Sequence, residues 1–349
     1  MKAVVFAGDG RVEVDEVAPP RIEEPGDAIV RIGLSAICGS DLHLLDGKTP
    51  GMRVGGVIGH EFVGTVEATG PGASGYAEGS RVLGSFLIAC GECPACTAAR
   101  YNHCRKRRAL GLGTLTGDLD GAQAEYVRVP IADVNLHPLE GPLASLTDEQ
   151  ALFCGDVLAT GMYAAHLAAA EAGDTVAVIG AGPIGLLSAM AVRRTGARVL
   201  VLDTDEQRVE FARGIGLEGL VVDADDPPGV IRSANGGEAA DVAIDAVGAV
   251  AVFKTAMRCV REGGRVVVIG VYGAERVELS MGRAWINGID IRFSGMANVQ
   301  AHWNEALSAV SLGELDPGQV ITHRLPLADA VEGYELFAAR EAMKVILQP

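Results

Sequence analysis

Short apolar runs separated by turn residues characterise the chain before about residue 150. Three of these runs, at residues 28–34, 61–68 and 125–130, have the length and β-branched composition of strands. Pro-Gly, Asp-Gly and Gly-rich segments lie between the runs, and such segments favour turns. The pattern predicts an irregular antiparallel β domain with long loops.

The spacing of apolar positions changes near residue 150. A helical pattern opens at Asp148, and near-continuous apolar runs then alternate with helical patterns as far as about residue 293. Such alternation is typical of a parallel sheet joined by right-handed crossovers, with helices covering both faces. Residues 302–315 and 328–340 have the pattern of amphipathic helices, and residues 343–349 that of a closing strand.

These patterns predict a two-domain α/β protein. We expect one domain over residues 1–155, a parallel-sheet domain over 156–293, and a C-terminal segment, 294–349, that packs back on the first domain. The length agrees, because 349 residues exceed what a single hydrophobic core usually supports.

Charge and composition exclude other classes of protein. The formal net charge is -16, whereas a nucleic-acid binder needs a basic surface. The N-terminal residues lack the pattern of a signal peptide. The longest apolar stretch, residues 176–192, is too short for a membrane span. We therefore expect a cytoplasmic protein that binds neither nucleic acid nor membrane.

A glycine-rich segment connects the strand pattern at 175–180 to a helical pattern. Its G-x-G-x-x-G spacing permits a tight turn, lets the backbone approach a pyrophosphate and allows close helix–strand packing. The free N–H groups of the following helix favour phosphate binding. The cofactor-binding residues predicted here are Gly180, Gly182, Pro183, Ile184 and Gly185.

The next apolar run ends at Asp203. A carboxylate at this position accepts hydrogen bonds from an adenosine ribose and repels a 2′-phosphate, which favours NAD over NADP. The alternative is that Asp203 caps the following helix. Arg208 lies nearby in the sequence and would soften the preference for NAD.

Four cysteines fall within residues 90–104, inside a loop that we place at about residues 88–106. In a reducing compartment such clustering indicates a metal site rather than disulfides. Four thiolates complete a tetrahedral zinc shell, which indicates a structural role. An iron–sulfur cluster is the alternative. The predicted ligands are Cys90, Cys93, Cys96 and Cys104.

Two further motifs complete a recognisable series: C-G-S-D-x-H at residues 38–43 and G-H-E at 59–61. Together with the cysteine loop and the glycine segment, in this order, they resemble the zinc-dependent medium-chain alcohol dehydrogenase family over essentially the whole chain. The resemblance implies a GroES-like catalytic domain, a doubly wound Rossmann domain that binds NAD, and a catalytic zinc in the cleft between them. Two zinc ions per chain are therefore expected.

The resemblance implies that Cys38 and His60 are ligands of the catalytic zinc. In the family the third ligand lies four residues before a Thr-Gly pair, which selects Asp156 ahead of residues 160–161. Cys154 is the alternative. If this stretch is helical, the two side chains point about 200° apart and only one can face the metal. A fourth position stays open for substrate, and Glu61 is implied to lie close to the metal.

The resemblance also implies roles around the reacting atoms. The alcohol proton passes to Ser40, then to the nicotinamide ribose and then to His43, while Asp41 organises the loop. Gly270 and Val271 approach the nicotinamide. Four large side chains line either the substrate pocket or a subunit contact: Phe86, Leu112, Trp285 and Met296.

The predicted activity is reversible oxidation of a small or secondary alcohol to a ketone or aldehyde with NAD. A polyol or amino-alcohol dehydrogenase of the same family is the nearer alternative. A catalytically inactive nucleotide-binding or structural relative is an alternative of another class. The family also implies a homodimer or homotetramer.

Overall fold

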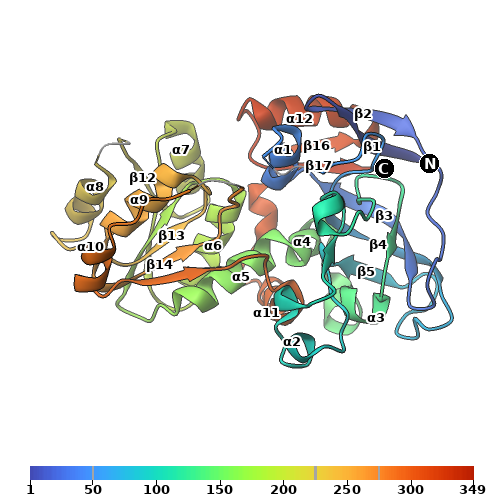
Figure 1. Cartoon of the computed structure of the whole chain (residues 1–349), viewed down its shortest axis with the longest axis horizontal. Coiled ribbons are helices and arrows are strands. Elements are labelled where there is room, and N and C mark those ends of the chain that lie inside the picture. The colour runs from blue at the N-terminus through green and yellow to red at the C-terminus, as the bar shows by residue number, and fades with distance from the viewer. Residues whose placement is uncertain (49–50, 224–225, 274–275) are drawn as a thin grey trace. The chain divides into compact units, whose positions relative to one another are not determined.

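The computed structural model describes residues 1–48, 51–223, 226–273 and 276–349 (Figure 1). The chain forms two compact units. One comprises residues 1–159 and 296–349, and the other residues 160–295. The boundaries expected from the sequence, 155/156 and 293/294, lie within a few residues of these divisions.

The first unit is built on a seven-stranded sheet with the order β16-β17-β3-β4-β5-β9, and β8 also pairs with β3. Neighbouring strands are antiparallel except β16 and β17, which are parallel. Alternate side chains of β3, including Val30 and Ile32, pack with Phe62 and Val66 of β4 in the core. The strands are β3 (Ala28–Ala36), β4 (Glu61–Thr69), β5 (Arg81–Gly84), β8 (Tyr126–Val129), β9 (Leu136–Pro138), β16 (His323–Pro326) and β17 (Val345–Gln348).

Two small ribbons and several helices complete this unit. β1 (Lys2–Gly8) pairs with β2 (Arg11–Glu16), and β6 (Leu87–Ile88) pairs with β7 (Arg108–Ala109). The C-terminal segment joins the unit because β17 hydrogen-bonds to β3, and side chains of α12 pack with those of β17 in one apolar cluster. The helices are α1 (Gly39–Leu45), α2 (Pro94–Thr97), α3 (Ala132–Asn135), α4 (Asp148–Leu152), α11 (Val299–Ser311) and α12 (Ala330–Ala338).

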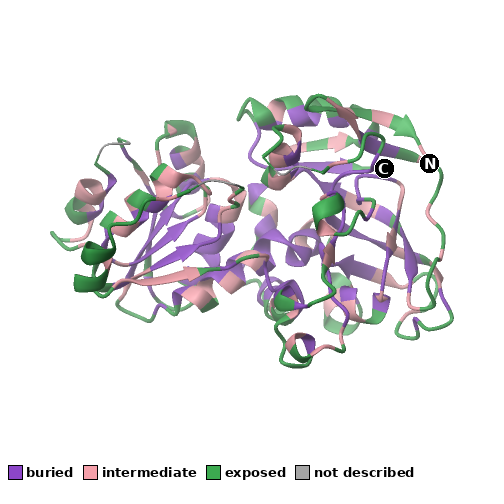
Figure 2. Ribbon diagram, in the orientation of Figure 1, coloured by how far each residue is buried: buried purple, intermediate pink, exposed green. Residues whose placement is uncertain are grey.

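The second unit contains a parallel six-stranded sheet with the order β12-β11-β10-β13-β14-β15. This is the strand order of a doubly wound dinucleotide-binding fold, and it confirms the fold class predicted from the sequence. Its central strands are buried (Figure 2), as expected for a parallel sheet covered on both faces. The strands are β10 (Thr175–Ile179), β11 (Arg198–Asp203), β12 (Glu218–Val221), β13 (Ala240–Asp245), β14 (Val260–Val268) and β15 (Asp290–Phe293).

Helices follow the strands of this sheet in sequence, as the alternating pattern predicts. Right-handed crossovers on either side of β10 place them on opposite faces. They are α6 (Pro183–Arg193), α7 (Glu206–Gly214), α8 (Pro227–Ala234), α9 (Val250–Cys259) and α10 (Met281–Ile286).

The helical stretch that opens at Asp148 is not continuous, contrary to the sequence pattern. α4 and a short 3-10 turn end at Gly155, α5 (Val157–Ala168) begins two residues later, and the axes differ by 51°. Asp156 adopts φ -151° and ψ -88°, outside the helical region. Gly155 packs so tightly that a Cβ atom there would lie 2.2 Å from the carbonyl oxygen of Gly84. The break therefore lets the chain pass close to β5 and takes Asp156 out of helical geometry.

Among the described residues, no single helix is long and apolar enough to cross a membrane. The bent pair α4 and α5, with the turn between them, meets the criteria of length and composition only.

Candidate zinc and dinucleotide sites

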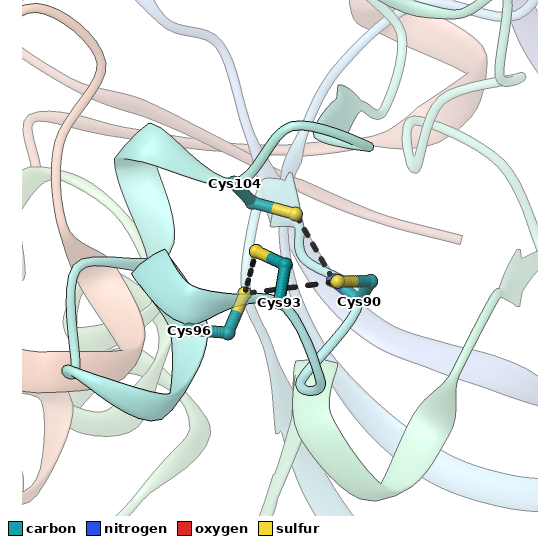
Figure 3. Close-up of side chains that lie close together, drawn as sticks. All are labelled: Cys90, Cys93, Cys96 and Cys104. Atoms are coloured by element: carbon teal, nitrogen blue, oxygen red, sulfur yellow. Dashed lines mark hydrogen bonds between the residues drawn. The ribbon is translucent and has the colours of Figure 1, made fainter.

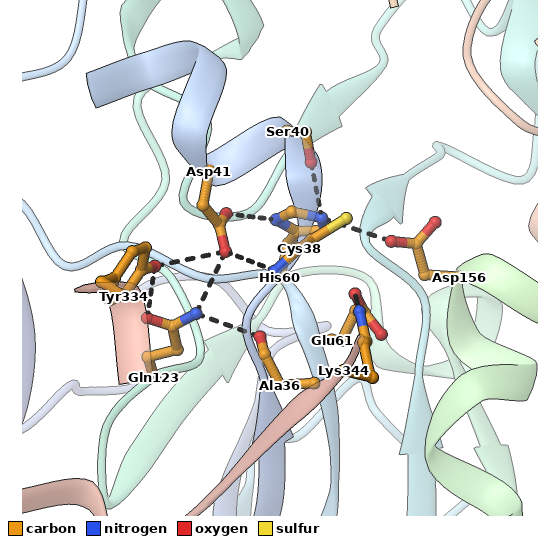
Figure 4. Close-up of polar contacts among 10 residues, drawn as sticks. All are labelled: Ala36, Cys38, Ser40, Asp41, His60, Glu61, Gln123, Asp156, Tyr334 and Lys344. Atoms are coloured by element: carbon orange, nitrogen blue, oxygen red, sulfur yellow. Dashed lines mark hydrogen bonds and ion pairs between the residues drawn. The ribbon is translucent and has the colours of Figure 1, made fainter. Parts of the chain in front are cut away.

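Four potential metal ligands converge in the first unit (Figure 4). Cys38 follows β3 and forms the N-cap of α1, whereas His60 and Glu61 stand at the start of β4. Asp156 lies at the break before α5. One ligand atom from each residue lies within 4.8 Å of all the others. The structure thus brings together the three ligands predicted from the sequence and the neighbouring carboxylate.

The chemistry of this group fits a zinc ion, because thiolate, imidazole and carboxylate are the usual zinc ligands. The His60 Nε2 and Asp156 Oδ2 atoms are 3.2 Å apart, and both side chains are buried. Burial lowers the pKa of His60, but the Asp41 carboxylate and the hydrogen bonds with Asp156, Asp41 and Cys38 raise it well above its usual value. The surroundings therefore favour a positive charge here, as a metal cation would supply.

A buried polar network supports His60 from the side opposite the metal ligands. Asp41 Oδ1 lies 3.2 Å from His60 Nδ1, and Asp41 Oδ2 accepts the backbone N–H of Cys38 at 3.0 Å. Gln123 Nε2 and the Tyr334 hydroxyl donate to the same oxygen at 3.1 and 3.2 Å. Such contacts fix the orientation of an imidazole ligand. Asp41 therefore organises the loop, as the sequence predicts.

The contributions of Gln123, Tyr334 and Lys344 were not predicted from the sequence. Lys344 immediately precedes β17, and its Nζ is 2.5 Å from Glu61 Oε1, with both side chains buried. Burial lowers the pKa of Lys344, but the charges of Glu61, Cys38 and Asp156 and the hydrogen bond to Glu61 together raise it above its usual value. Because a lysine beside a strand is usually exposed, nothing local to the sequence indicates this partner.

Cys154 does not join the group of ligands. Its Sγ donates to the carbonyl oxygen of Gln150 at 3.7 Å, and burial raises the pKa of the thiol. The break at Asp156 also removes the simple helical argument for separating the two positions. Local packing, rather than helical geometry, places Asp156 among the potential ligands and leaves Cys154 outside them.

Ser40 and His43, the two residues expected to relay a proton, both lie on α1. Ser40 Oγ is 3.2 Å from His60 Nε2, the ring nitrogen that faces Asp156. His43 follows three residues later on the same helix and is half-buried. Because residues three apart share a face of a helix, Ser40 and His43 lie along one side of α1.

Apolar side chains pack beside His60. The Phe86 ring meets the imidazole edge-on, with the ring centroids 5.9 Å apart. Leu112 and Met296 pack on the same cluster as Phe86. Trp285 instead lies on α10 in the second unit and is 81% exposed. Of the four large side chains singled out from the sequence, Phe86 therefore lies beside His60, Leu112 and Met296 pack on the same apolar cluster, and Trp285 lies on the surface.

The four cysteines of the loop form a second group of potential ligands (Figure 3). The Sγ atoms of Cys93 and Cys96 are 3.6 Å apart, and those of Cys90 and Cys96 are 3.9 Å apart. Four thiolates at 2.3 Å from one tetrahedral ion would lie about 3.8 Å from one another. The spacing fits a single ion better than a cluster of several irons.

Backbone hydrogen bonds to the cysteine sulfurs favour thiolates in this loop. Hydrogen bonds from the backbone of Cys96 and Arg105 lower the pKa of Cys93 to about 6. Burial raises the pKa of Cys96 to about 12. The N–H groups of Cys90 and Lys106 each donate to the sulfur of Cys104 at 3.4 Å. A divalent cation would favour thiolate throughout the group, since a coordinating thiol is deprotonated.

The predicted glycine segment forms the turn between β10 and α6 in the second unit. Gly180 has φ +109°, a conformation that other residues rarely adopt. A Cβ on Gly185 would lie 1.9 Å from the carbonyl oxygen of Gly180. Gly182 is the N-cap of α6 and Pro183 is its first residue, followed by Ile184. The free N–H groups of α6 therefore stand at the carboxyl end of the central strand, where such folds bind phosphates.

Asp203 ends β11, and its carboxylate serves this turn rather than the next helix. Oδ2 accepts the N–H of Ala181 at 2.8 Å, and Oδ1 accepts that of Asp205 at 3.0 Å. Asp205 is the residue that caps α7, by accepting from Gln207 and Arg208. The alternative that Asp203 is the helix cap is therefore wrong.

Three other predicted cofactor residues lie at this end of the sheet or beside the glycine turn. Arg208 Nη1 would lie 3.8 Å from a Cβ placed on Gly182. Gly270 and Val271 follow β14, whose carboxyl end lies at the same edge of the parallel sheet as Gly180.

Comparison with known proteins agrees with these features. Residues 24–140 match the alcohol dehydrogenase GroES-like domain, and residues 183–311 match the zinc-binding dehydrogenase family. These matches, together with the sheet order, define a zinc-type oxidoreductase with a GroES-like and a Rossmann domain. The chain belongs to the zinc-dependent medium-chain alcohol dehydrogenase family.

Full-length relatives are similar to this chain throughout. An alcohol dehydrogenase from Cupriavidus necator is 33% identical and covers 100% of this chain and 99% of its own length. The structure of alcohol dehydrogenase TADH from Thermus sp. ATN1 is 41% identical, with a TM-score of 0.93 and coverage of 100% and 99%. A zinc-binding dehydrogenase from Sinorhizobium meliloti 1021, bound to NADP, is 29% identical, with a TM-score of 0.84 and coverage of 100% and 99%.

Proposed function

We propose that this oxidoreductase reversibly converts a small or secondary alcohol to a ketone or aldehyde with NAD. The observation that carries the proposal is the convergence of Cys38, His60 and Asp156, with Ser40 Oγ 3.2 Å from His60 Nε2. An inactive relative would not need to keep three zinc ligands and a hydroxyl together. The family and the coenzyme fold supply the rest of the argument.

The two groups of potential ligands would hold two zinc ions with different roles. Cys38, His60 and Asp156 would hold a catalytic zinc, which lowers the pKa of the substrate hydroxyl when bound, while NAD accepts the hydride. Glu61 supplies a further carboxylate beside these ligands. In this proposal the group formed by Cys90, Cys93, Cys96 and Cys104 holds a structural zinc.

Ser40 and His43 would carry the substrate proton away. The Ser40 hydroxyl can accept a proton and donate its own, so it needs no permanent charge beside the metal ligands. His43 suits the outer end of the relay because an imidazole titrates near neutral pH. Their spacing on α1 keeps both side chains along one face.

The apolar wall beside His60 supports a simple alcohol over a polyol or an amino alcohol. Phe86 contacts the imidazole, and Leu112 and Met296 pack against the apolar cluster that contains Phe86. Additional hydroxyl or ammonium groups of a substrate would lose hydration against such a surface without regaining hydrogen bonds. We therefore place the physiological substrate among alcohols with an apolar substituent.

Asp203 supports NAD as the cofactor. Its carboxylate is held beside the glycine turn by the N–H of Ala181, where it would accept bonds from a ribose diol and repel a 2′-phosphate. Arg208 lies close to Gly182 and opposes this preference in part. The proposal is a preference for NAD rather than exclusion of NADP.

We also propose that the chain forms a homo-oligomer through the edge of the second unit. β15 is an edge strand, and Phe293 at its end is 66% exposed. Met281, Trp285 and Ile286 of the preceding α10 are 67%, 81% and 75% exposed. Exposed apolar clusters of this kind are typical of interfaces. Trp285→Glu should produce a smaller species in light scattering, whereas Leu115→Glu, at a site in the first unit that is 70% exposed, should not.

A cytoplasmic location is part of the proposal. All seven cysteines are free thiols: five lie in the two groups of potential metal ligands, and the other two, Cys154 and Cys259, are buried. Such thiols persist in a reducing compartment.

Metal analysis together with a substrate panel tests the proposed function. The wild-type protein should contain two zinc ions per chain, and Cys38→Ser should keep one and lose NAD-dependent alcohol oxidation. Cys259→Ser is the matched control, because Cys259 is buried outside both groups and should keep two zinc ions and full activity. Two zinc ions in Cys38→Ser, or the best rate with a sugar alcohol, would contradict the proposal.

A further inference from the structure

Asp245 connects the carboxyl ends of two neighbouring strands in the second unit, β13 and β14. It ends β13, where its carboxylate is fully buried. Its Oδ1 accepts the N–H groups of Val247 and Gly248, each at 3.0 Å. Its backbone carbonyl accepts the N–H groups of Ile269 and Gly270 from the loop after β14, each at 3.0 Å. One residue therefore fixes two loops at the end of the sheet that carries the glycine turn.

The two loops touch through backbone that excludes side chains. A Cβ on Gly270 would lie 2.1 Å from the nitrogen of Gly248. A Cβ on Gly248 would lie 2.3 Å from the carbonyl oxygen of Val271, and Gly248 also has φ +79°. The relative position of the loops is thus set within narrow limits at this contact.

Tyr272 fastens the second loop to Asp245. Its hydroxyl lies 2.6 Å from Asp245 Oδ2 and 2.8 Å from the carbonyl oxygen of Ala249. The hydroxyl proton is therefore shared between an acceptor on β13 and one in the loop that follows it. The Tyr272 ring packs on the core of the unit, so the bond is anchored at both ends.

Two apolar side chains border this fastened region. Val247 and Val271 are 44% and 48% exposed, although large aliphatic side chains are usually buried. A Cβ on Gly180 would lie 2.6 Å from a methyl carbon of Val247, so Val247 stands directly beside the glycine turn. Val247 and Val271 therefore form an apolar border that begins at the proposed pyrophosphate site and continues along the loop after β14.

We propose that Tyr272 is a positioning residue for the nicotinamide end of the cofactor. By bonding to Asp245 it holds Val271, and through the glycine contact Val247, in the arrangement that receives the nicotinamide ring. The adenosine end, at Asp203, lies on the far side of the glycine turn from this bond and does not depend on it. The inference rests on the proposed dinucleotide site and adds a residue that orients one half of the ligand.

The reason for a selective effect is pre-organisation. A ligand that binds to loops already held in place does not have to supply the free energy for ordering them. A hydrogen bond to a carboxylate contributes enough that its loss should weaken binding of the dependent half by about tenfold. Groups bound by the glycine turn alone should retain their affinity.

Calorimetric titration of the full-length protein with two ligands tests this inference. NADH contains the nicotinamide, whereas ADP-ribose lacks it and keeps the adenosine and the pyrophosphate. We expect Tyr272→Phe to weaken the binding of NADH about tenfold and to leave the affinity for ADP-ribose unchanged. Tyr76→Phe is the matched control, because it removes a phenol that donates to the Leu136 carbonyl oxygen at 2.6 Å in the first unit. It should change neither affinity.

The outcomes separate the inference from the proposed function. Equal weakening of both ligands would show that Tyr272 only stabilises the unit, and unchanged affinity for both would show that the bond has no role; either result overturns the inference alone. Failure of the wild type to bind either ligand would contradict the proposed dinucleotide site as well. If Tyr272→Phe unfolds, Val271→Ala, which removes an exposed side chain that the Tyr272 bond is proposed to hold in place, should give the same selective loss of NADH affinity, and its absence would overturn the inference.

Discussion

Lys344 and Glu61 form an ion pair beside the candidate catalytic metal site, with Nζ and Oε1 2.5 Å apart and the side chains 1% and 0% exposed (Figure 4). The Lys344 ammonium also lies 5.6 Å from the centroid of the Phe153 ring. Glu61 is the first residue of β4 and directly follows His60, whereas Lys344 immediately precedes β17. The Lys344 ammonium therefore neutralises the charge of the Glu61 carboxylate, which is buried next to other acidic groups.

Removing the cation of this pair should destabilise the first unit strongly. In Lys344→Met, Glu61 stays buried without its partner, and we expect the free energy of unfolding to fall by about 3–5 kcal/mol. The double variant Lys344→Met with Glu61→Gln should recover most of the loss, because no isolated charge remains. Denaturant unfolding of the zinc-loaded protein measures both effects.

An exposed lysine provides the comparison for this prediction. Lys106 pairs with Glu92 at 2.6 Å, with both side chains 69% exposed. Lys106→Met should leave the unfolding midpoint nearly unchanged, because exposed ion pairs contribute little. Similar losses in Lys344→Met and Lys106→Met would show that burial of the Glu61 pair is unimportant.

The third zinc ligand can be tested with two neighbouring substitutions. Asp156→Asn removes the carboxylate that lies 3.2 Å from His60 Nε2, and we expect it to lower zinc affinity at the catalytic site by at least tenfold. Cys154→Ala should keep two zinc ions, because its thiol contacts Gln150 instead. Competition with a chelator measures the affinity; a weaker site in Cys154→Ala than in Asp156→Asn would reverse the assignment.

Asp203 should determine the preference for NAD over NADP. The wild type should have a lower KM for NAD than for NADP, and Asp203→Ala should abolish or reverse this order because the carboxylate no longer repels a 2′-phosphate. Asp205→Ala is the control, because Asp205 caps α7 and its loss should affect stability more than cofactor choice. Equal use of both cofactors by the wild type would show that Asp203 does not read the ribose.

One ion pair predicts a dependence of stability on pH. Arg324 bonds to Glu149 through both oxygens, at 2.7 and 2.8 Å, and thereby lowers the pKa of Glu149 from 4.5. A lowered pKa in the folded state stabilises the protein above pH 4.5, and this contribution disappears as the pH falls through the folded-state pKa.

Arg324→Gln should therefore be less stable than the wild type by about 0.5 kcal/mol at pH 7, a small value because the pair is partly exposed. The difference should vanish in strongly acidic buffer. Thermal unfolding of both proteins across a pH series measures it, and a difference that persists at low pH would point to lost packing instead.

The sequence was sufficient for features that depend on neighbouring residues. The apolar runs that became β10, β11, β13 and β14 were recognisable because a strand buried on both faces has few polar positions. The glycine turn at residues 180–185 was recognisable because tight backbone geometry restricts residue type. Both signals are local, and both features occur where they were expected.

Features that depend on tertiary packing were missed or only partly predicted. The break at Asp156 arises because Gly155 packs against β5, a contact that helical periodicity cannot express. Tyr334 and Lys344 lie far along the chain from the residues that they contact, Asp41 and Glu61. Neither interrupts the apolar pattern of the helix or strand in or beside which it lies. Asp156 was selected by alignment to a family motif, and its position beside His60 follows from the break rather than from the expected helix.

The pairing of β17 with β3 sets the order in which the protein can assemble during synthesis. The first unit lacks this strand, and with it Lys344, until the ribosome has passed residue 348, long after residues 160–295 have emerged. The second unit is continuous and can fold as soon as it is made, whereas the first must remain incomplete meanwhile. The nascent chain can therefore gather the four cysteines of its loop early, but the group of Cys38, His60, Glu61 and Asp156 gains Lys344 only after the whole second unit has been made.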